Sequence, residues 1–327
     1  MQYKVALEEH FAISETLSDS QAYAPEEYWP ELSSRLIDIH TKRIAEMDKH
    51  GIEMMILSLN SPGVQAIHDI ARANDIARRG NDFLAEQVAK NPRRFQAFAA
   101  LPLQDPELAT LELERCIKQL GFRGALVNGF SQAGTPGTCL YYDLPQFWPF
   151  WEVVEKLDVP FYLHPRNPIA AWAQIYEGNS WLLGPTWAFG QETAVHALRL
   201  MGSGLFDAYP RLKVVVGHMG EGLPFSMWRI DNHNAWSEIT PKYKAKRKIA
   251  DYFHENFWLT TSGNFHTQTL IDAMLEVDAD HILFSADWPF EDIAHAAEWL
   301  DTASISESDR QKIGRTNSMR LFRLGNE

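Results

Sequence analysis

Cysteine is scarce in this chain of 327 residues, in which Cys116 and Cys139 are the only two. Two isolated cysteines cannot build a disulfide framework or a cysteine-based zinc site, which argues against the small secreted scaffolds that depend on such links. The first residues lead directly into a strand-like apolar run rather than into a charged and then apolar leader, so we expect no secretory signal. A cytoplasmic protein is therefore expected.

Long apolar runs and an excess of positive charge are also absent. No stretch approaches the roughly 20 apolar residues that a membrane-spanning helix needs. The 30 basic residues are outnumbered by 43 acidic ones, for a formal charge of −13. The densest basic run, "KYKAKRKIAD" at 242–251, is short, and we interpret it as the solvated face of a helix. Nucleic acid and anionic membranes are thus poor candidate partners.

About eight short apolar runs recur along the chain, and helix-like segments separate them. Several runs are apolar throughout rather than alternating, as is typical of parallel strands that are covered on both faces. The runs span residues 4–10, 54–60, 95–102, 124–129, 160–165, 212–220, 257–263 and 282–289. This alternation predicts an α/β fold of the TIM type, a (β/α)₈ barrel. A doubly wound sheet is the main alternative, but no glycine-rich phosphate turn follows any of the runs.

Domain organisation follows from the same pattern. No internal repeat or low-complexity linker interrupts the chain, so we expect one barrel domain over residues 1–327. Three connections after expected strands are long, at 14–40, 130–147 and 166–190. Such loops build the active site on the C-terminal face of a barrel. Most of their aromatic residues are nevertheless expected to serve packing or a subunit interface.

Polar side chains cluster where the expected strands end. Glu8 and His10 end the first strand and His164 ends the fifth. His218 ends the sixth, with Glu221 three residues later, and Asp287 ends the eighth. Side chains two apart on a strand share a face, so Glu8 and His10 should point together while Glu9 points away. In a closed barrel the eighth strand lies beside the first, which would bring Asp287 to them.

These residue types predict a metal site. A single histidine at the end of a strand is more often structural, but four polar positions at the same end of different strands favour a ligand set. Two imidazoles and two carboxylates suit one divalent first-row ion, with manganese(II) favoured by the share of carboxylates and zinc(II) possible.

Several motifs in combination resemble a known family. They include "KVALEEHFAI", "DVPFYLHPRNP", "GHMGEGLPF", "TTSGNF" and "FSADWPFE". Together they resemble the amidohydrolase superfamily, and within it the decarboxylase branch that contains the 2,6-dihydroxybenzoate (γ-resorcylate) decarboxylases. The first strand has Glu-x-His where hydrolytic members have His-x-His, and "GALVNG" offers no lysine for a bridge between two metals. One metal ion per subunit is therefore expected.

The resemblance also implies roles for individual residues. Glu8, His10, His164 and Asp287 would bind the metal, and His218 and Glu221 would have a catalytic or orienting role. Arg229 and Asn128 would lie near the substrate, and Tyr23 and Phe290 are added as candidate substrate contacts. The family further implies a homotetramer.

The expected function is a metal-dependent, non-oxidative and reversible decarboxylation of ortho-hydroxybenzoates. The first choice of substrate is 2,6-dihydroxybenzoate, which gives resorcinol and CO2, and the second is 2,3-dihydroxybenzoate or another hydroxybenzoate. An ortho hydroxyl would help the metal to chelate the substrate and would raise the basicity of the ring carbon. The sequence leaves open whether Asp287 or His218 delivers the proton. A mononuclear metal hydrolase of an amide, ester or lactone, with Asp287 as base, is the alternative enzyme, and a non-catalytic binding protein is a third possibility.

Overall fold

The computed structural model describes residues 3–135, 137–235 and 243–325. Within them, eight strands form one sheet in the order β1-β2-β3-β4-β7-β8-β9-β10, and every strand pair that is hydrogen-bonded in it is parallel. The strands are β1 (Lys4–Phe11), β2 (Ile52–Leu59), β3 (Phe95–Ala99), β4 (Gly124–Asn128), β7 (Phe161–His164), β8 (Val214–Val216), β9 (Phe257–Thr260) and β10 (Ile282–Leu283). Each lies within or overlaps one of the eight apolar runs, so the expected barrel is confirmed.

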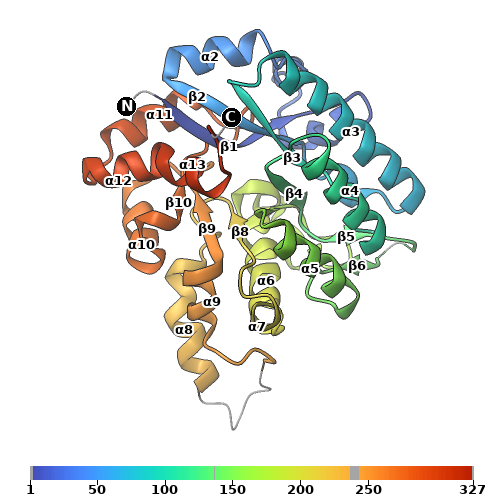
Figure 1. Cartoon of the computed structure of the whole chain (residues 1–327). Coiled ribbons are helices and arrows are strands. Elements are labelled where there is room, and N and C mark those ends of the chain that lie inside the picture. Colours follow the sequence, from blue (N-terminus) through green and yellow to red (C-terminus); the bar gives the residue numbers. More distant parts are fainter. Residues whose placement is uncertain (1–2, 136, 236–242, 326–327) are drawn as a thin grey trace.

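Helices connect the strands and surround them (Figure 1). They are α1 (Trp29–Ile37), α2 (Lys42–His50), α3 (Ile70–Lys90), α4 (Pro106–Lys118), α5 (Trp148–Leu157), α6 (Ala188–Gly202), α7 (Leu205–Ala208), α8 (Leu223–Ala235), α9 (Ile249–Asn256), α10 (Thr267–Val277), α11 (Ile293–Thr302), α12 (Glu307–Gln311) and α13 (Asn317–Leu321). Helix α4 shows how local sequence sets a boundary. The Asp105 carboxylate accepts hydrogen bonds from the backbone N–H groups of Glu107 and Leu108, and Pro106 occupies the first turn.

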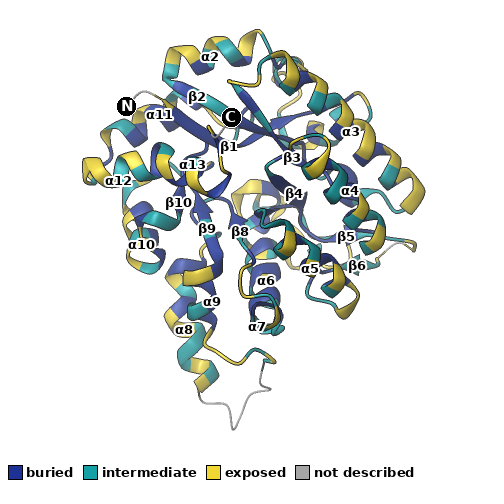
Figure 2. Ribbon diagram, in the orientation of Figure 1, coloured by how far each residue is buried: buried dark blue, intermediate teal, exposed yellow. Residues whose placement is uncertain are grey.

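Two apolar layers hold the barrel together. The larger layer lies between the strands and the helices, so the strands are buried while the outer helix faces are exposed (Figure 2). The smaller layer fills the barrel interior with one or two side chains from each strand, together with Leu321, Phe322 and Leu324 from the C-terminal segment. The Phe98 and Phe322 rings meet edge to face at 5.3 Å. A filled interior of this kind is typical of a barrel rather than an open sheet.

Strand β1 contains an irregularity next to the polar cluster. Ala6 pairs with Met55 and Glu9 pairs with Leu57, so three steps along β1 match two steps along β2. This extra residue is a β-bulge, which reverses the side-chain alternation beyond it. Leu7 therefore belongs to the barrel interior while Glu8, the next residue, also turns inward.

The barrel does not close by an ordinary strand ladder. Among the described residues, β10 pairs with β9 but no backbone ladder joins β10 to β1. Strand β1 is joined instead to the segment that follows β10, by the hydrogen bond from His10 N–H to the Trp288 carbonyl, at 2.7 Å, and by side chains described below.

The loop after β4 carries a two-stranded antiparallel hairpin of β5 (Ser131–Gln132) and β6 (Cys139–Leu140).

The basic run at 242–251 was expected on the face of a helix. This was wrong for residues 243–248, which are not helical and lead into α9, and residue 242 lies outside the described residues. No helix in the described part of the chain is long and apolar enough to cross a membrane.

Candidate metal centre and active site

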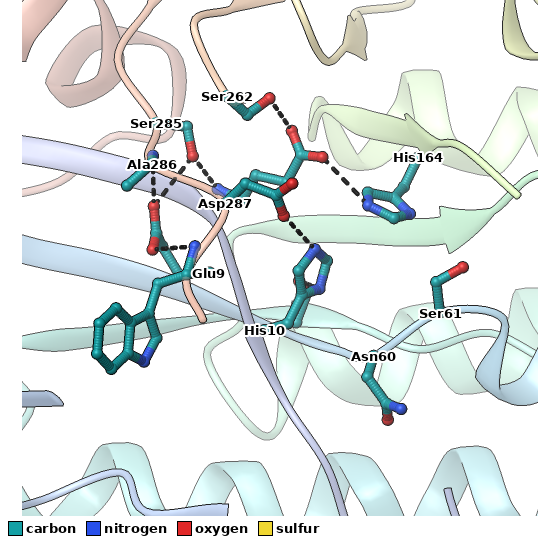
Figure 3. Close-up of polar contacts among 12 residues, drawn as sticks. Glu9, His10, Asn60, Ser61, His164, Ser262, Ser285, Ala286 and Asp287 are labelled. Atoms are coloured by element: carbon teal, nitrogen blue, oxygen red, sulfur yellow. Dashed lines mark hydrogen bonds and ion pairs between the residues drawn. The ribbon is translucent and has the colours of Figure 1, made fainter. Parts of the chain in front are cut away.

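Four side chains from distant parts of the sequence meet at the C-terminal mouth of the barrel. One potential ligand atom from each of Glu8, His10, His164 and Asp287 lies within 4.8 Å of the others. The bulged end of β1 supplies the first two, the end of β7 supplies His164, and the turn after β10 supplies Asp287. The His10 Nε2 atom lies 3.3 Å from Asp287 Oδ1, and His164 Nε2 lies 3.1 Å from Glu8 Oε1 (Figure 3).

The chemistry of this group fits a divalent cation. Glu8 Oε1, His10 Nε2 and Asp287 Oδ1 are buried atoms without a hydrogen-bond partner among the described residues. Orphaned polar atoms of this kind are costly unless a ligand satisfies them. The Nδ1 atom of His10 lies 3.2 Å from the Ser58 hydroxyl, which orients the ring so that Nε2 points into the group. Burial lowers the pKa of His164, which favours the neutral imidazole that binds metals.

The two oxygens of Glu8 have different environments. Hydroxyl groups of Tyr162, Thr260 and Ser262 all donate to Oε2, whereas Oε1 faces the imidazoles. Burial disfavours ionisation of this carboxyl, but the surrounding imidazoles outweigh burial and hold its pKa well below the usual range. The hydroxyls therefore fix an ionised Glu8 with one oxygen left for a cation.

A histidine that is not part of the group borders it. His218 Nδ1 lies 2.8 Å from Glu221 Oε1, while His218 Nε2 lies 3.7 Å from Asp287 Oδ2 and 3.6 Å from Glu8 Oε1. Burial opposes the charged imidazole, but Glu221 and Glu8 outweigh it and raise the pKa of His218 well above its ordinary value. The arrangement can hold a protonated imidazole against Asp287.

The backbone around these residues is unusual. His218, Glu221 and Asp287 have φ angles of 52°, 54° and 68°, in the left-handed region that non-glycine residues seldom adopt. Such conformations persist where the surrounding structure enforces them, and they concentrate at functional sites. Here they turn the chain sharply after β8 and β10, which aims the side chains at the barrel mouth.

The four residues that were expected to contact the substrate lie at different distances from the candidate metal group. The Phe290 ring lies 5.6 Å from that of His10, so it borders the group. Asn128 pairs with His164 across β4 and β7, and its Oδ1 is buried without a hydrogen-bond partner among the described residues. The Tyr23 ring lies 5.5 Å from that of Phe189. Arg229 is exposed on α8.

A cavity of about 840 Å³ connects several of these side chains. Phe189, His218, Glu221 and Arg229 line it, together with Gly263. Gly263 lies close to His218 and Asp287, because a Cβ built on it would lie 3.0 Å from the His218 ring and 3.8 Å from Asp287 Oδ2. The cavity therefore reaches the group beside His218, while a separate cavity lined by Gly51 and Ile52 lies at the start of β2, away from this mouth.

Sequence reasoning missed the residues that support the candidate ligands. Tyr162 lies two residues before His164 on β7, so the alternation of a strand would have placed both on one face. Ser58 lies opposite His10 in the β1–β2 register, which became visible only in the structure. Thr260 and Ser262 at the end of β9 carry no pattern that distinguishes them from ordinary polar residues.

The fold and the site define a class of protein: a parallel α/β barrel with a candidate metal-binding group at the C-terminal ends of its strands. A family model described as Amidohydrolase matches residues 27–324. This chain belongs to that amidohydrolase family. Its sequence is 70% identical over 324 residues, or 99% of each chain, to the gamma-resorcylate decarboxylase of a Polaromonas species.

This chain is also similar to solved structures of decarboxylases. A dihydroxybenzoic acid decarboxylase from Polaromonas, with bound manganese and the inhibitor 2-nitroresorcinol, superposes with a TM-score of 0.98 at 69% identity, covering 100% of this chain and 98% of that one. A 2,6-dihydroxybenzoate decarboxylase in complex with 2,6-dihydroxybenzoate superposes with a TM-score of 0.97 at 67% identity, covering 99% of this chain and 100% of that one.

Removing one hydroxyl from Glu8 tests the site. In Tyr162→Phe, Glu8 Oε2 loses a donor, so the carboxylate is held less firmly and manganese(II) affinity should fall by about 10-fold, the lower end for loss of a group that supports a ligand. Titration of the metal-free protein with manganese(II), followed by electron paramagnetic resonance of the free ion, measures the change. The control is Tyr142→Phe, because Tyr142 is also fully buried but its hydroxyl bonds to Ser131. An equal loss in both variants would contradict the prediction.

Proposed function

We propose that this chain is a manganese-dependent, non-oxidative decarboxylase that converts 2,6-dihydroxybenzoate to resorcinol and CO2, reversibly. The observation that carries the proposal is the convergence of Glu8, His10, His164 and Asp287 beside a His218–Glu221 pair. Relatives named for this activity, at 65–70% identity over nearly the whole chain, support it. Other ortho-hydroxybenzoates, 2,3-dihydroxybenzoate first among them, are the second choice of substrate.

Glu8, His10, His164 and Asp287 are the proposed ligands of one divalent cation per subunit. Manganese(II) is favoured because two of the four donors are carboxylates and because a relative was crystallised with manganese, and zinc(II) is the second choice. Once bound, the cation supplies Lewis acidity and a template for an ortho phenolate and a carboxylate oxygen of the substrate.

Side chains of the protein deliver the proton that the ring carbon needs. Cleavage of the bond between the ring and the carboxylate returns an electron pair to the ring carbon, and a proton must arrive there as CO2 departs. We assign the donor role to Asp287, whose Oδ2 faces His218 Nε2 across 3.7 Å. Glu221 holds the His218 ring through Nδ1, which keeps Nε2 directed at Asp287 and able to restore its proton. His218 is the second candidate for the donor itself.

The pocket residues are proposed to select an aromatic acid. Phe290 would pack against the ring beside His10, and Asn128 would offer its unpartnered Oδ1 to a substrate hydroxyl. Tyr23 would cover the ring from the long loop after β1, next to Phe189. Arg229, on the wall of the cavity, would attract the carboxylate on its way to the site.

Organisation at a larger scale is also proposed. One sheet and its surrounding core support a single domain over residues 1–327. A homotetramer is supported by large aromatic side chains that are exposed in the isolated chain, such as Trp181, Phe225 and Trp228. We also propose a cytoplasmic location, and the two cysteines are free thiols, as a reducing compartment would keep them.

A panel of benzoates with metal analysis on the same preparation tests the function. We expect turnover of 2,6-dihydroxybenzoate with release of CO2, no turnover of benzoate that lacks an ortho hydroxyl, and about one manganese(II) per chain for full activity. The physical reason is that both the chelate and the basicity of the ring carbon need the ortho oxygen. Equal turnover of benzoate would contradict the mechanism, and hydrolysis of amides or esters without decarboxylation would contradict the function.

The substitution Asp287→Asn tests the proton donor. An amide can bind a cation weakly through its oxygen but cannot protonate carbon, so kcat should fall by at least about 100-fold while substrate binding persists. Steady-state kinetics and substrate titration on manganese-loaded protein measure the two effects separately. Near-normal kcat would transfer the donor role to His218.

Sedimentation velocity tests the assembly. The wild-type chain should sediment as a tetramer at micromolar concentration, and Phe225→Glu should shift the distribution toward smaller species because it places a charge at a contact that the assembly buries. Leu275→Glu is the control, since Leu275 is equally exposed but lies on α10. A stable wild-type monomer would refute the prediction.

A further inference from the structure

Glu9 lies between two proposed metal ligands and has no part in the mechanism, although it is fully buried. Its side chain lies on the opposite face of β1 from Glu8 and His10, as expected from the sequence. There it extends across the seam between β1 and the segment that follows β10 (Figure 3). A buried carboxylate is expensive unless donors surround it, so its partners show what it does.

Three donors converge on the Glu9 carboxylate, and all come from the segment that carries Asp287. Oε1 accepts from the Ser285 hydroxyl at 3.0 Å and from the Ala286 N–H at 2.9 Å. Oε2 accepts from the Trp288 N–H at 3.2 Å. The carboxylate thus bonds to the backbone on both sides of Asp287.

The contacts of Glu9 lie between β1 and the end of β10, where the described residues form no backbone ladder. The Ser285 hydroxyl that donates to Glu9 also accepts from the N–H groups of Leu7 and Glu8, at 3.3 and 2.6 Å, the two residues that have no partner in the β1–β2 register. From α2, Arg43 Nη2 donates to the His10 carbonyl at 2.5 Å. Arg43 is itself fully buried and supplies positive charge near Glu9.

We propose that Glu9 is a positioning residue for the metal centre: its carboxylate replaces the absent β10–β1 ladder and holds Asp287 in its left-handed conformation. Asp287 has φ 68°, which a non-glycine residue adopts only under constraint. With the N–H groups of Ala286 and Trp288 fixed, the Asp287 side chain is held toward His10 and His218. Without the Glu9 carboxylate, the backbone N–H groups on both sides of Asp287 lose the acceptor that holds them.

The substitution Glu9→Gln tests this with almost no change in volume. The amide oxygen can keep the partners of Oε1, but its NH2 group would then face the Trp288 N–H, so one flank of Asp287 is released. Manganese(II) affinity of the metal-free full-length protein should fall by about 10- to 100-fold, as for other groups that orient metal ligands. The electron paramagnetic resonance spectrum of the bound ion should also change, because its ligand geometry is less uniform.

The matched control is Glu112→Gln. Glu112 is equally buried and accepts hydrogen bonds from Asn81 and Arg115, both at 2.7 Å. These residues lie on α3 and α4 rather than on the strands and the turn that form the seam. Loss of the Glu112 carboxylate should lower the unfolding temperature but leave the manganese(II) affinity and the electron paramagnetic resonance spectrum of the bound ion unchanged. If Glu9→Gln lowers only the unfolding temperature and binds manganese(II) like the wild type, Glu9 is merely structural and the proposal is overturned.

A second variant covers the case in which Glu9→Gln does not fold. Ser285→Ala removes the donor shared by Glu9 and the bulge, and it should weaken manganese(II) binding in the same direction by a smaller factor. Wild-type affinity in Ser285→Ala would overturn the proposal. The inference rests on the proposed ligand set, but metal binding is measured without substrate, so a wrong substrate assignment would leave this test unaffected.

Discussion

The seam between the first and last strands is the constraint on which this site depends. A barrel of parallel strands brings residues 8–10 and 285–288 together only if its two ends meet, yet no backbone ladder joins β10 to β1 in the described residues. Side chains take over that task, chiefly Ser285 and Glu9, along with the bond from His10 N–H to the Trp288 carbonyl. The consequence is that the closure of the fold and the placement of two candidate metal ligands depend on the same few hydrogen bonds.

Electrostatics explains why these acids are arranged as they are. Glu8 is fully buried, and its charge is compensated by three hydroxyls on one oxygen and by imidazoles facing the other. Glu9, one residue away, has different partners, and burial raises its pKa to about 7 although the Ala286 N–H and Arg43 act to lower it. Adjacent carboxyls on opposite faces of one strand thus experience opposite shifts. A cation among Glu8, His10, His164 and Asp287 would balance the two carboxylates in that group, which buried charges require.

Much of the fold and of the candidate ligand set could be predicted from the sequence. The eight apolar runs coincide with the eight strands because buried parallel strands need continuous apolar segments, a property that is local and visible. The cap that Asp105 provides at the start of α4 is equally local, because it involves only the next three residues. The convergence of Glu8, His10, His164 and Asp287 was predictable because chain order around a barrel fixes which strands are neighbours and where their C-terminal ends lie. The helical interpretation of 243–248 failed because a pattern of exposed charges does not distinguish a helix from a solvated loop.

The sequence by itself determined the architecture, the end of the barrel that holds the candidate site and the four side chains that meet there. These follow from the spacing of apolar residues, the order of the strands along the chain and the types of polar residue at the strand ends. Only the tertiary structure decided how those side chains are aimed. The bulge in β1 appears in the register with β2, Tyr162 and Ser262 reach Glu8 from β7 and from the end of β9, and Ser285 and Glu9 meet across the seam. Each of these contacts joins residues that are far apart along the chain or depends on pairing between strands. No local pattern encodes them, since they exist only once the barrel has closed.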